Sequence, residues 1–255
     1  MDLPLARDVT PRVEYVPASA STNADLRVLA EDLVGWPHLS TLVTRNQTAG
    51  RGRLDRVWTA PDGAALAISV VVRVSVDPAL RGWIPLIAGI AMADAVAAQL
   101  PAHTVGVKWP NDVLVDDHKI CGILAEATVD AIIIGAGVNT AMTAEQLPVP
   151  TATSFAVQGV VADEDRLLAD YLRELDALLT ALVDAGDAVA SGLHAAATDR
   201  ITTLGRSVRV SLPGDRTLEG TARELDDEGR LVVRHGGADH PISAGDVVHV
   251  RPLQD

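Results

Sequence analysis

The chain has 255 residues and a formal net charge of −13 at pH 7, with 21 Lys and Arg against 34 Asp and Glu. Its 48% hydrophobic and 22% charged residues exclude a disordered chain, and its length suits one sizeable domain plus a small one. The acidic balance argues against non-specific nucleic-acid binding, and the single cysteine, Cys121, excludes an intramolecular disulfide framework or a multi-cysteine metal site.

The N-terminal segment has no basic region followed by an apolar block, so we expect no secretory signal and a cytoplasmic protein in a reducing compartment. Ser21, Thr22 and Asn23 precede an apolar-periodic stretch that ends near residues 36–37. Asp25 follows Thr22 by three residues, as in a capping box, and a helix is predicted to begin here. Ser, Thr and Asn are the preferred helix caps, so by themselves these residues do not indicate a binding site.

Residues 41–45 and 64–74 are rich in β-forming residues and predict two strands, with a Gly- and Arg-rich loop between them. Glycines let a ligand approach the main chain, and guanidinium groups suit phosphate oxygens. Three arginines close together are unusual in an acidic chain. This loop is therefore predicted to bind the phosphate of a small anionic ligand. The alternative is a solvated arginine-rich turn. The residues that carry this prediction are Gly50, Arg51, Gly52, Arg53, Arg56 and, as a surface for base stacking, Trp58.

The most apolar window spans residues 82–101, but it contains Pro85 and Asp94 and lacks basic residues on one side. We therefore predict a buried helix over residues 82–100 in preference to a membrane span. Short strands are predicted to follow over residues 105–109, 113–116, 119–128 and 131–135.

Lys108 ends the first of these strands and precedes a Trp-Pro pair, which restricts the backbone where a side chain must be aimed. An ammonium group held there can bond both a carboxylate and a phosphate, and can stabilise the charge that develops as one attacks the other. Asn111 and Asp112 suit either a turn or a metal held with phosphate, and the turn is preferred. Lys119 is either another functional lysine or a solvated charge at a hairpin tip, and the solvated charge is preferred.

A buried strand over residues 132–135 runs into Gly135, Gly137 and Asn139. This Gly-x-Gly pattern lacks the third glycine and the following helix of a dinucleotide site, and tight strand packing explains it nearly as well. The seven histidines show no metal-ligand spacing, and no protein metal site is predicted.

The second half of the chain predicts a surface connection, then helices, then short strands. The helices are expected over residues 163–184, with Asp163 as the cap, and over residues 187–199. The strands, separated by turn signals, are expected over residues 208–212, 217–225, 231–234 and 247–250. The fold class is therefore α+β: a mixed sheet with flanking helices over residues 1–203, plus a small C-terminal β-barrel over residues 204–255.

In order and spacing, these motifs resemble the biotin protein ligase family, that is, biotin–[acetyl-CoA carboxylase] ligases, over nearly the whole chain. The motifs that carry the resemblance are residues 21–23, 47–53 through Trp58, 108–112, 119–126, 135–139 and 152–154. The fold that the resemblance implies is a biotin/lipoate ligase-like catalytic domain.

The resemblance implies a two-step reaction, with magnesium expected alongside ATP. The biotin carboxylate attacks the α-phosphate of ATP and releases pyrophosphate, and a carrier-protein lysine then captures the biotinyl-adenylate as an amide. Lys108 would bridge the carboxyl and phosphate groups, and Arg53 would act with it. The implied biotin contacts are Ser21, Thr22, Asn23, Gln47, Arg51, Gly52, Arg53 and Lys108. The implied ATP or adenylate contacts are Gly50, Arg51, Gly52, Arg53, Trp58, Asn111, Asp112 and Asn139.

The chain departs from the family at three places. About twenty residues precede Ser21, too few for the winged helix-turn-helix domain of relatives that repress transcription, so no operator binding is expected. Asp55 stands where many relatives have glycine, and Cys121 replaces a small residue and is interpreted as inert packing. The implied partner is a biotin carboxyl carrier protein or domain of acyl-CoA carboxylases, without nucleic acid or membrane, and we expect a monomer or weak homodimer.

Two alternatives remain beside the ligase. A lipoate ligase or octanoyltransferase shares the catalytic fold but is not expected to carry the Gly- and Arg-rich loop. A non-catalytic biotin or nucleotide sensor keeps the pocket without turnover, and retention of Lys108 argues against it. Hydrolase chemistry is disfavoured because no Gly-x-Ser-x-Gly elbow is present.

Overall fold

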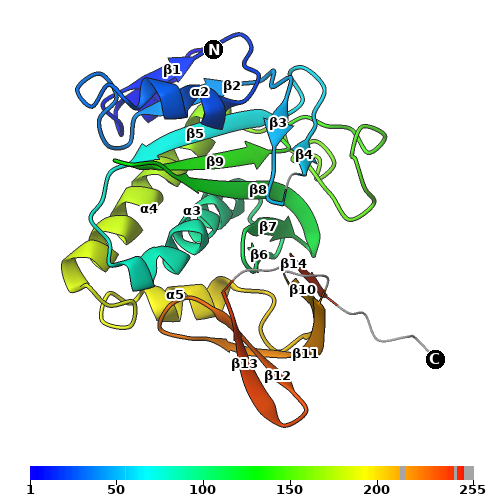
Figure 1. Cartoon of the computed structure of the whole chain (residues 1–255). Coiled ribbons are helices and arrows are strands. Elements are labelled where there is room, and N and C mark those ends of the chain that lie inside the picture. Colours follow the sequence, from blue (N-terminus) through cyan, green and yellow to red (C-terminus); the bar gives the residue numbers. More distant parts are fainter. Residues whose placement is uncertain (55, 213–215, 244–245, 250–255) are drawn as a thin grey trace.

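A seven-stranded mixed sheet forms the centre of the catalytic part of the molecule (Figure 1). The structure, a computed structural model, describes residues 1–54, 56–212, 216–243 and 246–249. β1 is parallel to β2, and the other neighbours in the sheet are antiparallel. In sheet order the strands are β1 (Val13–Tyr15), β2 (Thr41–Thr44), β5 (Leu66–Val72), β9 (Ile132–Val138), β8 (His118–Ala127), β7 (Asp112–Val115) and β6 (Val105–Lys108).

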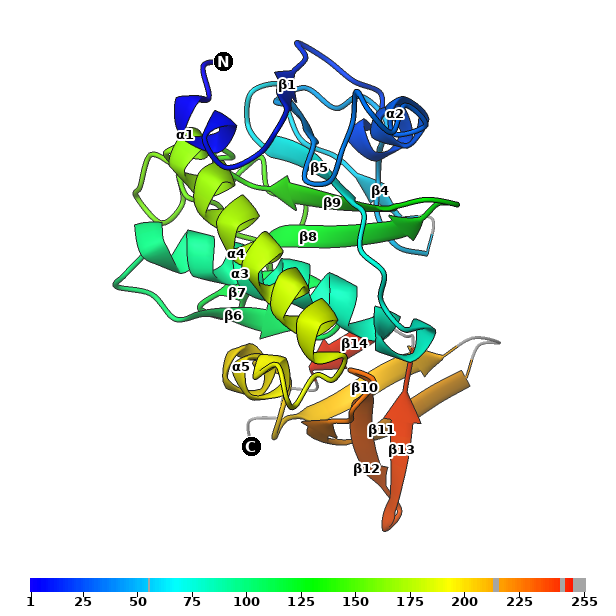
Figure 2. The ribbon, with the colours of Figure 1, turned by 90° about the vertical axis from the view of Figure 1, so that its left-hand side faces the viewer.

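Helices cover the two faces of this sheet unequally (Figure 2). α3 (Trp83–Gln99) and α4 (Glu164–Ala185) pack on one face, where Ile68 and Val70 of β5 enter the main core. α2 (Thr22–Leu29) packs on the opposite face, where Val71 enters a smaller cluster. This alternation along β5 is the pattern of a strand buried on both faces. The short helices are α1 (Pro4–Arg7), the 3-10 helix η1 (Pro78–Gly82) and α5 (Leu193–Arg200).

The structure confirms the predicted long helices. Residues 78–99 are apolar and long enough to cross a membrane, but α3, which makes up most of them, is buried in the core of the molecule, as predicted. α4 begins after Asp163, whose carboxylate accepts the backbone N–H of Arg166 at 3.0 Å, so the predicted cap is confirmed.

The structure confirms that a helix begins at residues 21–23, but the predicted end of this helix and its capping box were wrong. The helix stops at Leu29 instead of continuing towards residues 36–37. Ser21 occupies the N-cap position without a side-chain cap bond, and the Asp25 carboxylate accepts from the Ser19 hydroxyl at 2.6 Å, so no capping box forms. The side chains of Thr22 and Asn23, in the first turn of α2, bond other segments of the chain instead. α5 is also shorter than predicted, because it begins at Leu193.

The C-terminal strands form a separate antiparallel sheet in the order β13-β12-β11-β10-β14, which confirms the α+β class. β13 was not predicted, and within the described residues no pairing joins it to β14 to close a barrel. The predicted strand 247–250 extends to residue 250, which lies outside the described residues. The strands are β10 (Ser207–Leu212), β11 (Arg216–Leu225), β12 (Leu231–His235), β13 (Ala238–Ile242) and β14 (Asp246–His249).

Two tryptophans attach this sheet to the catalytic part. The indole N–H of Trp83, on α3, donates to the Asp227 carbonyl at 2.8 Å. The indole N–H of Trp109, after β6, donates to the Gly229 carbonyl at 3.1 Å in a buried setting. Both carbonyls belong to the turn between β11 and β12, so this turn is fixed against the segment that carries Lys108 and Asn111.

We expect Trp109→Phe to lower the free energy of unfolding by about 1–2 kcal/mol, because it leaves the buried Gly229 carbonyl without its donor. Urea denaturation measures this. Trp36→Phe, the same change at a buried tryptophan on the opposite face of the sheet, is the control for lost indole packing. Equal unfolding free energies for Trp109→Phe and the wild type would show that this hydrogen bond does not hold the turn.

Candidate active site

Small residues lie in register across three strands, on the sheet face opposite α3 and α4. Ala67 of β5 pairs with Gly137 of β9, which pairs with Gly122 of β8. Ser69 pairs with Gly135 in the next row on the same face. Paired residues share a sheet face, so residues with little or no side chain leave space above the sheet at this place. Ala67 and the three glycines form the floor of a cavity.

Two neighbouring side chains depend on these glycines. A Cβ atom on Gly137 would lie 2.6 Å from the indole of Trp58, and one on Gly135 would collide with the amide of Asn23. A Cβ atom on Gly122 would lie 3.3 Å from the same indole. Close approach of Trp58 and Asn23 therefore explains the Gly-x-Gly pattern more fully than strand packing does.

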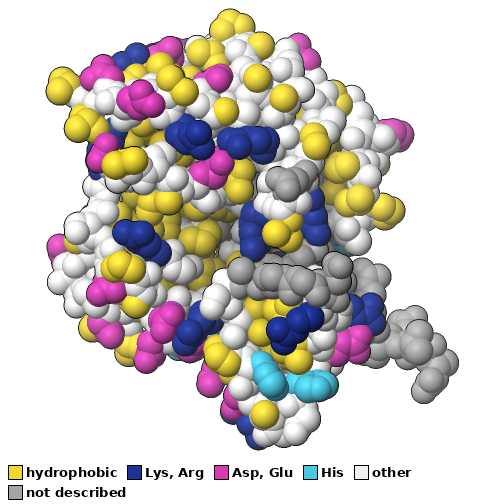
Figure 3. All heavy atoms as spheres, viewed as in Figure 1, with side chains coloured by type: hydrophobic (Ala, Val, Ile, Leu, Met, Phe, Trp, Pro, Cys, Tyr) yellow, Lys and Arg dark blue, Asp and Glu magenta, His cyan; other side chains and the backbone are white. Residues whose placement is uncertain are grey.

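The Gly- and Arg-rich loop forms a two-stranded ribbon over this floor (Figure 1). Its strands are β3 (Gly50–Arg51) and β4 (Val57–Trp58). Figure 3 shows Lys and Arg side chains gathered below this ribbon, in the hollow between the two parts of the molecule. Asp55, which departs from many relatives, lies outside the described residues.

The cavity has a volume of about 150 Å³ and brings together most of the residues predicted for the site. They come from α2, the ribbon, the turn after β6 and the start of β7, which are far apart in the sequence. The predicted residues that line it are Ser21, Thr22, Asn23, Gln47, Arg51, Gly52, Arg53, Trp58, Asn111 and Asp112.

Hydrogen bonds hold the arginine side chains of the ribbon against the sheet. Arg51 Nη2 donates to Glu126 Oε2 at 3.0 Å, and Arg53 Nη1 donates to Asn111 Oδ1 at 2.9 Å. Asn111 Nδ2 in turn donates to the Ile123 carbonyl at 2.9 Å. Both ends of the Asn111 amide are thus used within the protein, in keeping with its predicted structural role in the turn.

Two lysines share one carboxylate beside the ribbon. Lys119 Nζ lies 2.6 Å from Asp112 Oδ1, and Lys108 Nζ lies 3.6 Å from Asp112 Oδ2. Lys119 Nζ also lies 5.7 Å from the ring centre of Trp58, within cation–π range. Lys119 lines the cavity, whereas Lys108 does not. The prediction that Lys119 is a solvated hairpin-tip charge was therefore wrong.

A β-bulge explains the position of Lys119. On the pairing of β7 with β8, Val113 lies opposite Cys121 but Leu114 lies opposite Lys119, so Ile120 is an extra residue. One extra residue moves the residues before it to the other face of the strand. Lys119 thus shares the face of Asp112 and Gly122, over the cavity. Lys108 pairs with Asp112 and lies one strand further from the cavity.

Two other predicted residues do not line the cavity. Gly50 lies where a Cβ atom would collide with the main chain of Trp58, so it supports the ribbon. Asn139 follows β9, is buried, and donates to the Thr153 carbonyl at 2.9 Å. Its Oδ1 atom is buried and has no hydrogen-bond partner among the described residues. Contact of either residue with a ligand remains a prediction.

Sequence reasoning missed two residues of this region, Ser69 and Glu126. Ser69 is buried on β5 and bonds both Thr22 and Asn23; Glu126 on β8 accepts from Asn23 and Arg51. Glu126 lies at the end of a motif that the sequence analysis identified, but nothing in the sequence near Ser69 marks it. Within the described ranges, His, Cys, Asp and Glu form no group of three or more that could hold a metal ion.

Comparisons with known proteins identify the family. The Biotin/lipoate A/B protein ligase family matches residues 17–139, and the Biotin protein ligase C terminal domain matches residues 203–250. The chain is 41% identical over 248 residues to the biotin--[acetyl-CoA-carboxylase] ligase of Mycobacterium tuberculosis, covering 94% of this chain and 90% of that protein. The chain belongs to the biotin protein ligase family.

Other members of the biotin protein ligase family give the same picture. The chain is 33% identical to the bifunctional ligase/repressor BirA of Escherichia coli over 213 residues. The matched region covers 80% of this chain and 64% of that protein. A biotin protein ligase from Aquifex aeolicus, solved with biotin and ATP, shares the fold with a TM-score of 0.77 at 22% identity, covering 95% of this chain and all of that one. A biotin protein ligase from Leishmania major, solved with biotinyl-5-AMP, has a TM-score of 0.64 at 28% identity. The match covers 92% of this chain and all of that one.

Cys121 is buried on the core side of β8, and burial raises the pKa of its thiol above the ordinary range. The thiol therefore stays protonated near neutral pH, and thiols react as thiolates. We expect iodoacetamide at pH 8 to leave the folded protein unlabelled and to label the urea-unfolded protein once, as measured by mass spectrometry. Rapid labelling of the folded protein would contradict the interpretation of Cys121 as inert packing.

Proposed function

We propose that this protein is an ATP-dependent biotin protein ligase that biotinylates a lysine of a carrier protein or domain of an acyl-CoA carboxylase. The observation that carries the proposal is the 41% identity to a biotin--[acetyl-CoA-carboxylase] ligase over 94% of the chain. The cavity supports it, because residues of the predicted motifs converge there.

Biotin is proposed to bind at the α2 side of the cavity and the adenylate beneath the ribbon. The α2 side is lined by buried hydrogen-bonding groups of Ser21, Thr22 and Asn23, with Gln47 beside them. Such groups suit a small polar ring that must be held in one orientation. The adenylate would lie near the Trp58 indole, with Arg51 and Arg53 close enough to contact its phosphate.

In the first step, negative charge moves from the biotin carboxylate oxygen to the oxygen of the leaving pyrophosphate. Lysine and arginine side chains can stabilise this charge. A biotin carboxylate oxygen attacks the α-phosphorus of ATP, and pyrophosphate leaves with the electrons of the broken P–O bond. We propose that Lys119, together with Arg53, contacts the carboxyl and phosphate oxygens, because Lys119 is the lysine that lines the cavity. Lys108, predicted for this role, would act through Asp112, whose carboxylate both lysines contact.

In the second step, the acceptor lysine of the carrier attacks the acyl carbon of the biotinyl-adenylate as a neutral amine, AMP leaves, and the amide forms as the nitrogen loses its proton. Magnesium is expected to accompany ATP. Mg²⁺ typically combines one or two carboxylates with substrate phosphates. Since Asp112 already contacts two ammonium groups, we propose that phosphate oxygens supply most of the ligands of this ion.

We expect the wild-type protein to exchange pyrophosphate into ATP when biotin is present, and not when lipoate replaces it. This reaction reports the first step without the carrier. Exchange with lipoate alone would assign the protein to the lipoate branch of the fold. Exchange with neither acid, combined with biotin binding, would favour a non-catalytic sensor.

We expect Lys119→Ala to lower the rate of biotin-dependent exchange by about 10²–10³-fold, the usual effect of removing one donor from developing charge. Lys108→Ala should lower it by about tenfold or less, because Lys108 would act through Asp112. Circular dichroism and thermal unfolding check that both variants fold. A larger loss in Lys108→Ala than in Lys119→Ala would restore the bridging role to Lys108.

A further inference from the structure

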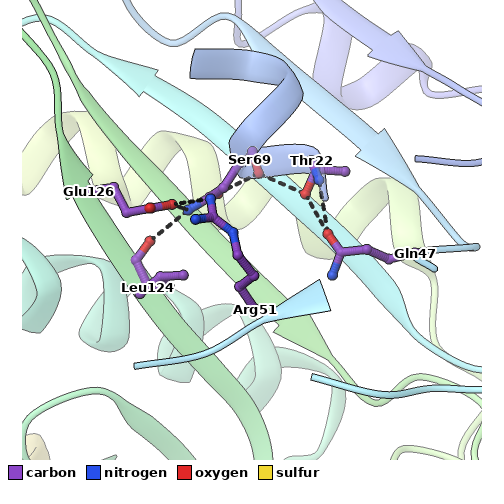
Figure 4. Close-up of polar contacts among 7 residues, drawn as sticks. Thr22, Gln47, Arg51, Ser69, Leu124 and Glu126 are labelled. Atoms are coloured by element: carbon purple, nitrogen blue, oxygen red, sulfur yellow. Dashed lines mark hydrogen bonds and ion pairs between the residues drawn. The ribbon is translucent and has the colours of Figure 1, made fainter. Parts of the chain in front are cut away.

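The carboxylate of Glu126 joins two parts of the cavity wall that are far apart in the sequence. Its Oε2 atom accepts from Asn23 Nδ2 at 2.8 Å and from Arg51 Nη2 at 3.0 Å (Figure 4). Asn23 lies in the first turn of α2 and Arg51 lies on β3 of the ribbon, and both line the cavity. One carboxylate oxygen therefore connects the helix at one side of the cavity to the ribbon over it.

The alternation of β8 explains why a carboxylate lies here. Gly122, Leu124 and Glu126 are two residues apart and share the cavity face of the strand. Glu126 pairs with Ile133 of β9, which belongs to the smaller apolar cluster beneath α2. Its side chain is only 22% exposed, and a carboxylate partly removed from water is costly unless it is paired. The amide and the guanidinium supply that pairing.

The two partners of Glu126 differ in how firmly they are held. Asn23 is 4% exposed, and its amide also contacts the Leu124 carbonyl at 3.2 Å and the Ser69 hydroxyl at 2.6 Å. The Arg51 side chain is 44% exposed. Asn23 thus fixes the carboxylate, and the fixed carboxylate holds the more exposed arginine. This contact uses one nitrogen of a guanidinium that carries five N–H groups, so Arg51 can bind Glu126 and a phosphate at once.

We propose that Glu126 is a positioning residue that holds the Arg51 guanidinium at the cavity before ATP binds, so that Arg51 meets the phosphate already oriented. Ordering a free arginine side chain costs much conformational entropy. Where an ion pair has already ordered it, phosphate binding loses less of this entropy and gains affinity. The inference rests on the proposed function and deepens it, because it names a residue that improves ATP binding without touching the ligand.

The Glu126 carboxylate also repels phosphate, which opposes this effect. Within the described residues, Arg51 lines the cavity and Glu126 does not, so the ligand meets the cation at shorter range than the carboxylate. We therefore expect the orienting effect to outweigh the repulsion. Binding measurements decide between the two, because they change the affinity for ATP in opposite directions.

The test compares Glu126→Gln with Asp170→Asn. Glu126→Gln removes the charge but keeps an amide oxygen that can accept from Asn23. Asp170 is the matched control, because its side chain is 19% exposed and pairs with Arg166 at 2.6 Å and Arg173 at 2.8 Å on α4, on the other face of the sheet. Isothermal titration calorimetry gives the dissociation constants of biotin and, in biotin-saturated protein, of an ATP analogue. A methylene group between its α- and β-phosphates prevents adenylation.

We expect Glu126→Gln to raise the dissociation constant of the ATP analogue about five- to tenfold, because a neutral oxygen holds the guanidinium more weakly. The dissociation constant of biotin should stay within about twofold, and Asp170→Asn should change neither ligand by more than that. Glu126→Asp keeps the charge but shortens the side chain by one methylene, and should give the same selective loss. In Arg51→Gln, adding Glu126→Gln should cause no further loss, since Glu126 acts through Arg51.

A purely structural role for Glu126 would weaken biotin and the analogue alike in both Glu126 variants. That result, unchanged or tighter binding of the analogue, an equal loss in Asp170→Asn, or additive losses in the double variant would overturn the inference and leave the proposed function in place. Failure of the wild type to bind biotin or the analogue would overturn the proposed function as well.

Discussion

Pairing of Ala67, Gly137 and Gly122 across β5, β9 and β8 leaves one place on a covered sheet face without side-chain bulk. The Trp58 indole approaches the sheet there, and α2 presents Asn23 over the neighbouring Gly135. A single methyl group added to this floor would meet an indole or an amide, so the cavity has little tolerance for change. The ribbon, the arginines and the lysine beside them all take their positions relative to this floor.

Charge in the site is organised around few carboxylates. Asp112 contacts two lysines, and Glu126 contacts Arg51 and the amide of Asn23. Each carboxylate forms an ion pair with lysine or arginine side chains that could also bind a phosphate. The negative charge of the carboxylates offsets the repulsion between these neighbouring positive groups. An anionic ligand entering the cavity would add further partners for these cations in a partly enclosed setting, where charge-assisted hydrogen bonds are strong.

Local patterns were enough to predict much of the fold. The apolar stretch of α3, the leucine stripe and Asp163 cap of α4, and most strands follow from composition and periodicity over short windows. Contacts between distant segments were not predictable: Ser69 meets Asn23 across 46 positions, and Glu126 meets it across 103. The bulge at Ile120, which brings Lys119 onto the cavity face, depends on pairing with β7 and leaves no mark in the sequence. α2 ends at Leu29, and Asp32 beyond it accepts the backbone N–H groups of Val34 and Gly35 in a turn.

The central claim is that one cavity, floored by Ala67, Gly137 and Gly122, holds the reacting groups with Lys119 beside them. A crystal structure of the protein grown with biotin and ATP tests this most directly. The account predicts a biotinyl-adenylate over this floor, with Lys119 Nζ within hydrogen-bonding distance of its carboxyl or phosphate oxygens. A ligand bound elsewhere, or one that contacts Lys108 Nζ while Lys119 points away, would contradict it.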